Sequence, residues 1–251
     1  MNPKISAIEC LKEGWECFKV RYWQNVGIYI LLFVSMMIIP ISLEYLFRYF
    51  GISIQDNGFS WISNFIIMPI FIGNLIYVTL KIARKKFGSF RLFNFNFKFM
   101  IKIVYAFVIL YLILMSSFPI SIGIVYLALY TQKIPFFVTV IVAIVSASIS
   151  MYFVLRTQFV YYILADDSEI SVINAIKKSF RITRGHILSY LRLFGLLALA
   201  TWAGIILFII PGIIAYIVGW IALSRFYLKL IDIDNANQES EQPQKIPVIP
   251  L

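Results

Sequence analysis

The chain has 251 residues, of which 61% are hydrophobic and 14% are charged, and its mean hydropathy is +0.87. This composition excludes an ordinary water-soluble domain and indicates an integral membrane protein. The formal net charge of +10 does not indicate nucleic-acid binding, because no base-reading module accompanies it.

The first predicted element is an amphipathic helix over residues 5–22, in which acidic and basic residues balance. Its apolar residues recur at spacings of three and four and predict one apolar stripe, formed by Ile8, Leu11, Trp15, Phe18 and Tyr22. This stripe is expected to anchor the helix at the membrane boundary. Cys10 and Cys17 are separated by a helical rise of about 10 Å, which is too long for a disulfide. Both are therefore expected to be reduced thiols on the helix surface.

Six apolar segments follow, and each is long enough to cross the hydrocarbon layer, which needs about 20 mostly apolar residues. They are predicted at residues 26–47, 59–80, 103–126, 136–155, 188–209 and 213–230. The connections between these segments alternate between the two sides of the membrane. All Lys and Arg residues except Arg48 and Lys133 fall on the side that also holds both chain ends. Because basic residues resist translocation, both termini are predicted to be cytoplasmic.

Polar residues interrupt the second and fourth of these segments. The candidate kink and cavity residues are Asn64, Pro69, Asn74, Ser146, Ser150 and Arg156. Proline in a membrane helix frees a carbonyl that needs another partner, so a kink is expected at Pro69. Arg156 is expected to extend its side chain to the inner headgroups, with a buried gate or substrate-binding charge as the alternative.

A second interfacial helix is predicted at residues 169–185, capped by Asp167 or Ser168 and ended by Gly185. Its predicted apolar stripe consists of Ile173, Ile176, Phe180, Thr183 and Ile187. The remaining surface carries four cations, Lys177, Lys178, Arg181 and Arg184. A cation near an anionic leaflet contributes about 1 kcal/mol, so these four form the candidate site for lipid headgroups. A purely topogenic role, in which the charges only orient the spans, explains them as well.

Segments 5–20 and 170–185 align with four identical positions, which are Ile5 with Ile170, Ser6 with Ser171, Ile8 with Ile173 and Lys12 with Lys177. A proline occurs near the outer end of the span that follows each copy, and Pro119 has a similar place in the third span. This pattern favours a three-fold internal repeat of helical hairpins, each preceded by an interfacial helix. Chance similarity between amphipathic helices is the alternative.

Within residues 161–191, an aromatic-rich helix end leads into Ala165-Asp166-Asp167, and a helix with Ala175 and Ser179 leads to Arg184-Gly185 before the next span. This stretch resembles the signature of a group of bacterial six-span proteins. The group includes the YciC-like proteins and the membrane domain attached to some glycerophosphodiester phosphodiesterases. The resemblance implies a protein of the bacterial cytoplasmic (inner) membrane, with a role in lipid homeostasis or peptide resistance. It does not imply phosphodiesterase activity, because a separate soluble barrel carries that chemistry.

No catalytic constellation is found in the sequence. His186 is the only histidine and is expected to be structural or solvent-facing, and motifs such as HExxH, GxSxG and GxxxxGK[ST] are absent. The acids Asp166, Asp167, Glu169, Asp232 and Asp234 suit a cation site, but helix capping and solvation explain them more simply. Neither an enzyme nor a metal or other cofactor is expected.

The sequence therefore predicts an all-α protein with a six-span membrane domain over residues 1–234 and a disordered cytoplasmic tail over 235–251. Its predicted role is to bind anionic lipid, a membrane protein partner or a second copy of itself, without catalysis. Two alternatives remain open. One is a transporter, flippase or channel-like protein for a lipid or small amphipathic substrate, and the other is an accessory subunit of a membrane complex.

Overall fold

The computed structural model describes residues 5–50, 63–85, 96–116, 123, 126 and 136–241. Every regular element in these ranges is a helix. The first half contains α1 (Ala7–Lys19), α2 (Tyr22–Tyr49), the π-helical turn η1 (Ser63–Ile67), α4 (Met68–Ala83) and α5 (Phe97–Ser116). The second half contains α7 (Phe136–Thr157), α8 (Val160–Asp166), α9 (Val172–Ile182), α10 (Ile187–Leu207) and α11 (Ile209–Glu241).

Six helical segments are long and apolar enough to cross a membrane, which confirms the multi-pass prediction at this level. They are Tyr22–Tyr49, Ser63–Ala83, Phe97–Met115, Val140–Asp166, Ile187–Leu207 and Ile210–Ser240. The third begins at Phe97 instead of residue 103, and most of its predicted second half, residues 117–126, lies outside the described residues.

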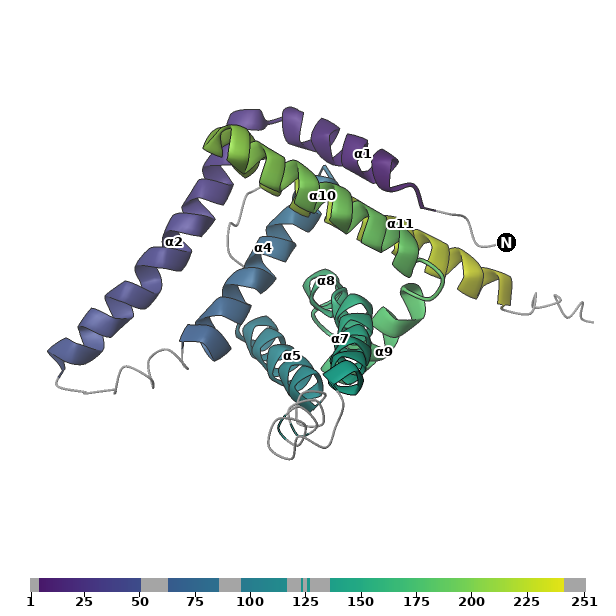
Figure 1. The fold of residues 1–251 in the computed structure, drawn as a ribbon. Coiled ribbons are helices and arrows are strands. Elements are labelled where there is room, and N and C mark those ends of the chain that lie inside the picture. The colour runs from purple at the N-terminus through teal and green to yellow at the C-terminus, as the bar shows by residue number, and fades with distance from the viewer. Residues whose placement is uncertain are drawn as a thin grey trace, which may run out of the picture.

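The helices are arranged around α11, which packs against α10, α1 and α4. Figure 1 shows α1, α10 and α11 running alongside one another, whereas α2 and α4 cross their direction. The six candidate spans are therefore not all parallel to one another. Helix α8 packs against α4 and α9. Arg84, at the C-terminal end of α4, lies next to Asp166 at the end of α8, so α9 lies on the same side of the assembly as this end of α4.

The largest core cluster contains buried aromatic side chains where α8, α10 and α11 meet, among them Phe159, Tyr162, Tyr190, Phe226 and Tyr227. The ring of Phe159 lies 5.3 Å from that of Tyr190 and 6.1 Å from that of Tyr227, centroid to centroid. In contrast, α2 and α7 expose many large apolar side chains, as expected of helices that face lipid.

The turn between α10 and α11 is tighter than predicted and lies at Phe208 instead of Pro211-Gly212. Pro211 falls in the first turn of α11, where a missing backbone N–H breaks no helical hydrogen bond. A Cβ atom on Gly204 would lie 2.7 Å from the backbone nitrogen of Gly212. Glycine at both positions therefore allows α10 and α11 to pack closely although only one residue connects them.

The predicted interruption of the second span occurs as a π-helical turn, η1, which ends directly before α4. Pro69 lies at the start of α4 and is buried, and Asn64 lies exposed in η1. A π-helical turn is one of the recognised causes of a bend in a long helix.

The predicted boundary between the membrane domain and the disordered tail is wrong for residues 235–241, because α11 continues to Glu241. Adding residues to an existing helix is much cheaper than nucleating one. In addition, the side-chain amide of Gln238 donates to Asp234 Oδ2 at 3.1 Å, one turn earlier in the helix. Residues 242–251 of the predicted tail lie outside the described residues.

Candidate functional site

Helix α9 begins later than predicted. Its N-cap is Ser171, whose hydroxyl oxygen accepts a hydrogen bond from the backbone N–H of Asn174 at 3.3 Å. The predicted cap Asp167 instead accepts from the backbone N–H of Glu169 at 2.9 Å and closes the preceding turn. The helix ends at Ile182, three residues before the predicted end, and Gly185 lies in the turn that follows, with a φ of 86° that favours glycine.

The buried face of α9 differs from the predicted stripe by one position. Val172, Ala175, Ser179 and Ile182 are buried, whereas Ile173 is 56% exposed. In a membrane, small residues favour close helix packing, and large apolar residues are equally stable against lipid. The predicted stripe marks the packing face only in part, because Thr183 is buried and Ile176 and Ile187 pack against the core, whereas Ile173 faces outward.

Helix α1 also buries small residues outside its predicted stripe, namely Ala7, Cys10, Gly14 and Cys17. Of the predicted stripe, Phe18 is fully buried and Leu11 packs against the core, whereas Ile8 is 71% exposed. Both cysteines are free, but they are buried instead of surface-exposed. Burial raises the pKa of the Cys10 thiol to about 11, so this thiol is protonated and unreactive at neutral pH.

Arg156 positions the C-terminal end of α9. Its Nη1 donates to the backbone carbonyl of Phe180 at 2.7 Å, and the Ser179 hydroxyl donates to the carbonyl of Arg156 at 2.6 Å. A cation at a helix C-terminus is also favoured by the helix dipole. This contact gives Arg156 a structural role at the last turn of α9, and its predicted roles as a headgroup contact or a gate stay predictions.

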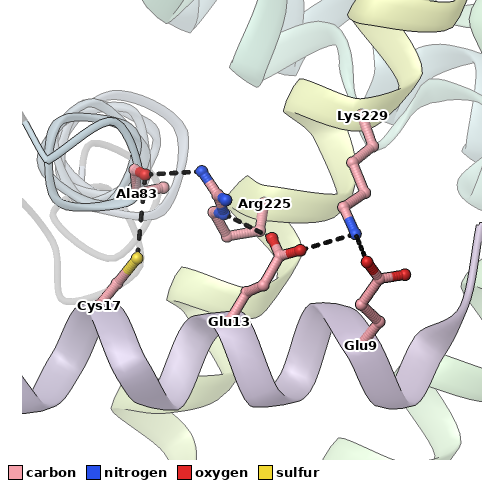
Figure 2. A network of polar contacts seen from close by, with 6 residues as sticks. All are labelled: Glu9, Glu13, Cys17, Ala83, Arg225 and Lys229. Carbon is pink, nitrogen blue, oxygen red and sulfur yellow. Dashed lines mark hydrogen bonds and ion pairs between the residues drawn. The ribbon is translucent and has the colours of Figure 1, made fainter.

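Helix α11 is positioned by a network of polar contacts with α1 and α4 (Figure 2). The Glu13 carboxylate lies 2.8 Å from Arg225 Nε and 2.8 Å from Lys229 Nζ, and Lys229 also lies 3.1 Å from Glu9. Arg225 Nη1 donates to the carbonyl of Ala83 at 3.1 Å, at the end of α4. Although burial opposes ionisation of Glu13, hydrogen bonds from Lys229 and Arg225 hold its pKa below the ordinary value.

The contact between α1 and α11 is also close at the level of the backbone. A Cβ atom on Gly14 would lie 3.0 Å from the Cα and backbone nitrogen of Ala222. Glycine at this position therefore brings the carboxylate of Glu13, its chain neighbour, within reach of α11.

Between the C-terminal end of α9 and the second half of α11 lies an open groove of about 440 Å³. We refer to it as the basic groove. Its lining residues are Arg181, Ile182, Arg184, Gly185, His186, Leu230, Ile233, Asp234, Asn237 and Gln238. Its volume falls within the range of about 300–1,000 Å³ that is usual for small-molecule sites.

Arg181 and Asp234 form a bidentate ion pair across the basic groove. Arg181 Nε and Nη2 donate to the two carboxylate oxygens of Asp234 at 3.0 and 2.9 Å. Gln238 donates to the same carboxylate, which is almost fully buried, with 9% of its side chain exposed. These bonds fix the plane of the guanidinium group.

The structure divides the four predicted headgroup-binding residues into two pairs. Arg181 and Arg184 line the basic groove, whereas Lys177 and Lys178 are not among its lining residues. Within the described part of the chain, Lys177, Lys178 and Arg184 have no ion-pair partner, so all three cations remain available to an anion.

Four groove residues, His186, Asp234, Asn237 and Gln238, were not predicted as site members. His186 is 5% exposed, and burial lowers the pKa of its imidazole. Asp234, Asn237 and Gln238 share the helical spacing of Leu230, so extending the last predicted helix past residue 230 would have placed them on one face.

The predicted cavity residues of the second and fourth spans bond within their own helices. Asn74 Nδ2 donates to the carbonyl of Ile70 at 3.0 Å, and the hydroxyls of Ser146 and Ser150 donate to carbonyls four residues earlier at 2.5 and 2.9 Å. These bonds favour a structural role for the side chains.

Three of the five acidic residues considered for a cation site, Asp166, Asp167 and Asp234, take part in ion pairs or hydrogen bonds through their carboxylates. Asp166 lies 2.6 Å from Arg84 and accepts a hydrogen bond from the hydroxyl of Tyr227 at 3.2 Å, and Asp234 is paired with Arg181. No group of three or more His, Cys, Asp or Glu residues in the described ranges is placed to hold a metal ion.

No protein-family model matches the chain, and neither the curated proteins nor the solved structures contain a match. The resemblance of residues 161–191 to bacterial six-span proteins therefore stays a prediction.

Proposed function

We propose that this protein is a non-enzymatic, multi-pass protein of a bacterial cytoplasmic membrane, where its basic groove binds an anionic lipid headgroup. Such binding would serve envelope or lipid homeostasis, including resistance to membrane-active peptides, as the resemblance of residues 161–191 implies. The observation that carries the proposal is that Arg181, in the last turn of α9, and Arg184, in the turn that follows the helix, line the same groove. Arginine is well suited to a phosphate because its planar donors match the phosphate oxygens.

The surroundings of the basic groove support a site at the membrane surface. Helix α9 is short and carries polar residues on one side, and Ile173 in its first turn is 56% exposed and suited to acyl chains. The nearby cations Lys177 and Lys178 add attraction to an anionic leaflet of about 1 kcal/mol each. We also propose that this surface is cytoplasmic, because the basic residues of alternate connections and both chain ends would then share one compartment.

The internal repeat is part of the same proposal. The aligned serines Ser6 and Ser171 are the N-caps of α1 and α9. Helix positions that correspond in the alignment are buried on both helices, including Cys10 with Ala175 and Gly14 with Ser179. These correspondences favour two copies of one structural unit, of which only the second has a strongly basic surface.

The test is the lipid content of the purified protein in mild detergent. Replacing Arg181 and Arg184 together by Gln is expected to reduce copurified phosphatidylglycerol and cardiolipin. The matched control replaces Lys177 and Lys178 by Gln, which removes the same amount of charge from α9 residues that do not line the groove. Equal lipid content in both variants and the unmodified protein would refute the proposal. An equal loss in both would mean that charge alone, without the groove, attracts lipid.

A further inference from the structure

The basic groove has three chemically distinct walls. The α9 side is cationic, with Arg181 and Arg184, and the α11 side carries the amides of Asn237 and Gln238. Apolar side chains, Ile182, Leu230 and Ile233, complete the lining. A complementary ligand must therefore combine an anion, hydrogen-bonding groups and an apolar portion.

The formal charge of the groove limits the charge of that anion. Two of its lining residues are positively charged, and Asp234 is the only acidic one among the described residues that line it. Since Asp234 is paired with Arg181, the groove carries one net positive charge when His186 is neutral. Burial lowers the pKa of His186 and so favours the neutral imidazole. One net positive charge matches a phosphodiester, which has a single negative charge, better than a phosphomonoester, which has close to two near neutral pH.

The Arg181–Asp234 pair also disfavours headgroups that carry an ammonium group. The Asp234 carboxylate already accepts three hydrogen bonds, two from Arg181 and one from Gln238. A headgroup ammonium would need a free anionic partner, and no other acid lines the described groove. The ammonium group of an ethanolamine or choline headgroup would therefore lie beside net positive charge, with no free carboxylate to pair with.

Donors and acceptors remain available on three sides of the groove. Arg181 uses Nε and Nη2 for Asp234, and its Nη1 has no hydrogen-bond partner among the described residues. The His186 imidazole is 5% exposed and lines the groove, and neither of its ring nitrogens bonds to a described side chain or backbone group. Asn237 likewise presents both a donor and an acceptor through its amide. Neutral groups of this kind are partners for hydroxyls.

We infer that the basic groove selects a lipid whose headgroup is a monoanionic phosphodiester with free hydroxyls, as in the phosphoglycerol headgroup. This inference rests on the proposed function and adds the headgroup class. Arg184 and Nη1 of Arg181 hold the phosphate, and Asn237 and His186 hold the hydroxyls. Asp234 is a positioning residue that fixes the guanidinium of Arg181. The apolar lining residues contact the glycerol backbone and the first methylenes of the acyl chains.

The experiment measures lipid retention by native mass spectrometry of the full chain, from nanodiscs with a phosphatidylcholine background. Four lipids are compared at equal content. Phosphatidylglycerol is the expected ligand, and phosphatidylmethanol has the same phosphodiester without hydroxyls. Phosphatidic acid is the phosphomonoester, and phosphatidylethanolamine carries the ammonium group.

We expect phosphatidylglycerol to be retained about three- to tenfold better than phosphatidylmethanol, which is the usual effect of one neutral hydrogen bond. Retention of phosphatidic acid and phosphatidylethanolamine is expected to be lower still. Arg184→Gln should reduce retention of phosphatidylglycerol about tenfold or more, whereas Lys177→Gln should reduce it by at most about fivefold and should not change the preference over phosphatidylmethanol. Asn237→Leu should remove the preference over phosphatidylmethanol and leave phosphatidylmethanol retention unchanged. Melting temperature and size-exclusion profile verify that each variant is folded.

Three results would overturn the inference. Equal retention of phosphatidylglycerol and phosphatidylmethanol, with both lost in Arg184→Gln, would refute the hydroxyl selection and leave the proposed function standing. If no anionic lipid exceeds phosphatidylcholine, the proposed function fails as well. If soluble glycerophosphoglycerol binds as tightly as the intact lipid, the ligand is a soluble phosphodiester instead of a lipid.

Discussion

Replacing Glu13 by Gln tests whether the polar network in Figure 2 holds α1 on α11. The carboxylate bridges Arg225 and Lys229 at 2.8 Å each, and about a quarter of each of the three side chains is exposed. A hydrogen bond between charged groups contributes about 1.5–3 kcal/mol. The loss in this variant should be smaller than two such bonds, because Arg225 keeps the carbonyl of Ala83 and Lys229 keeps Glu9. We therefore expect α1 to be held about 2 kcal/mol more weakly, which is about a 30-fold larger detached fraction.

The two cysteines of the chain make this detachment measurable. Cys10 and Cys17 are the only cysteines, and both face the α1 contact, with exposed fractions of 0% and 1%. A maleimide reaches them when α1 separates from α11. When closing is faster than labelling, the labelling rate follows the detached fraction. The predicted result is about a 30-fold faster reaction of Glu13→Gln at neutral pH, with the site of labelling identified by mass spectrometry.

Glu16→Gln is the matched control, because it removes the same charge from the same helix. The side chain of Glu16 is 59% exposed and lies 3.7 Å from Lys19 within α1 itself. Exposed pairs of this kind contribute about 0–1 kcal/mol, so labelling should change little. If Glu13→Gln reacts no faster than Glu16→Gln, the network does not hold α1 and the reasoning from its geometry is wrong.

Three further outcomes follow from the same contacts. Gly14→Val should lower the melting temperature, because overpacking costs about 1–3 kcal/mol, and a second change of Ala222 to Gly should restore part of the loss. Arg156→Met should leave the carbonyl of Phe180 with only the longer, 3.3 Å hydrogen bond from the Thr183 hydroxyl, and should increase proteolysis of residues 167–186 under native conditions, at a cost of about 1 kcal/mol. Since the pKa of Glu13 lies below its ordinary 4.5, its stabilisation is complete above that pH and is lost as the pH falls through the lower, folded-state pKa. Acidification also reduces the thiolate fraction, so the labelling rate of the folded protein is divided at each pH by that of the unfolded chain. This ratio should rise on acidification in the unmodified protein, and the rise should be smaller in Glu13→Gln.

The sequence was sufficient for the coarse fold because hydropathy over about 20 residues is a strong signal. It was not sufficient for the packing faces of α1 and α9. The predicted stripes selected large apolar residues such as Ile8 and Ile173, as is correct for a helix whose other side faces water. Here Ile8 and Ile173 face outward, whereas Phe18 of the first stripe and Thr183 of the second are buried together with the small residues Gly14 and Ser179. Apolar size alone therefore does not select the packing face, because a large apolar side chain is equally stable against lipid.

The candidate site could be predicted only in part for a different reason. The basic residues of 170–186 are adjacent in sequence, so Arg181 and Arg184 were found. Asp234 is 53 residues from Arg181, and only the packing of α11 brings the two together. Asn237 and Gln238 belong to a polar segment whose composition is typical of disorder, and its helical state depends on the helix that precedes it.

The pairing of Glu13 with Arg225 joins residues that are 212 positions apart in the chain. A ribosome makes α1 before α11, so the buried face of α1 has no α11 partner until the spans between the two helices have been synthesised. The contact between α1 and α11 therefore forms late relative to the insertion of those spans. Variants that weaken this contact should accumulate as chains in which the spans are inserted and α1 is not yet packed.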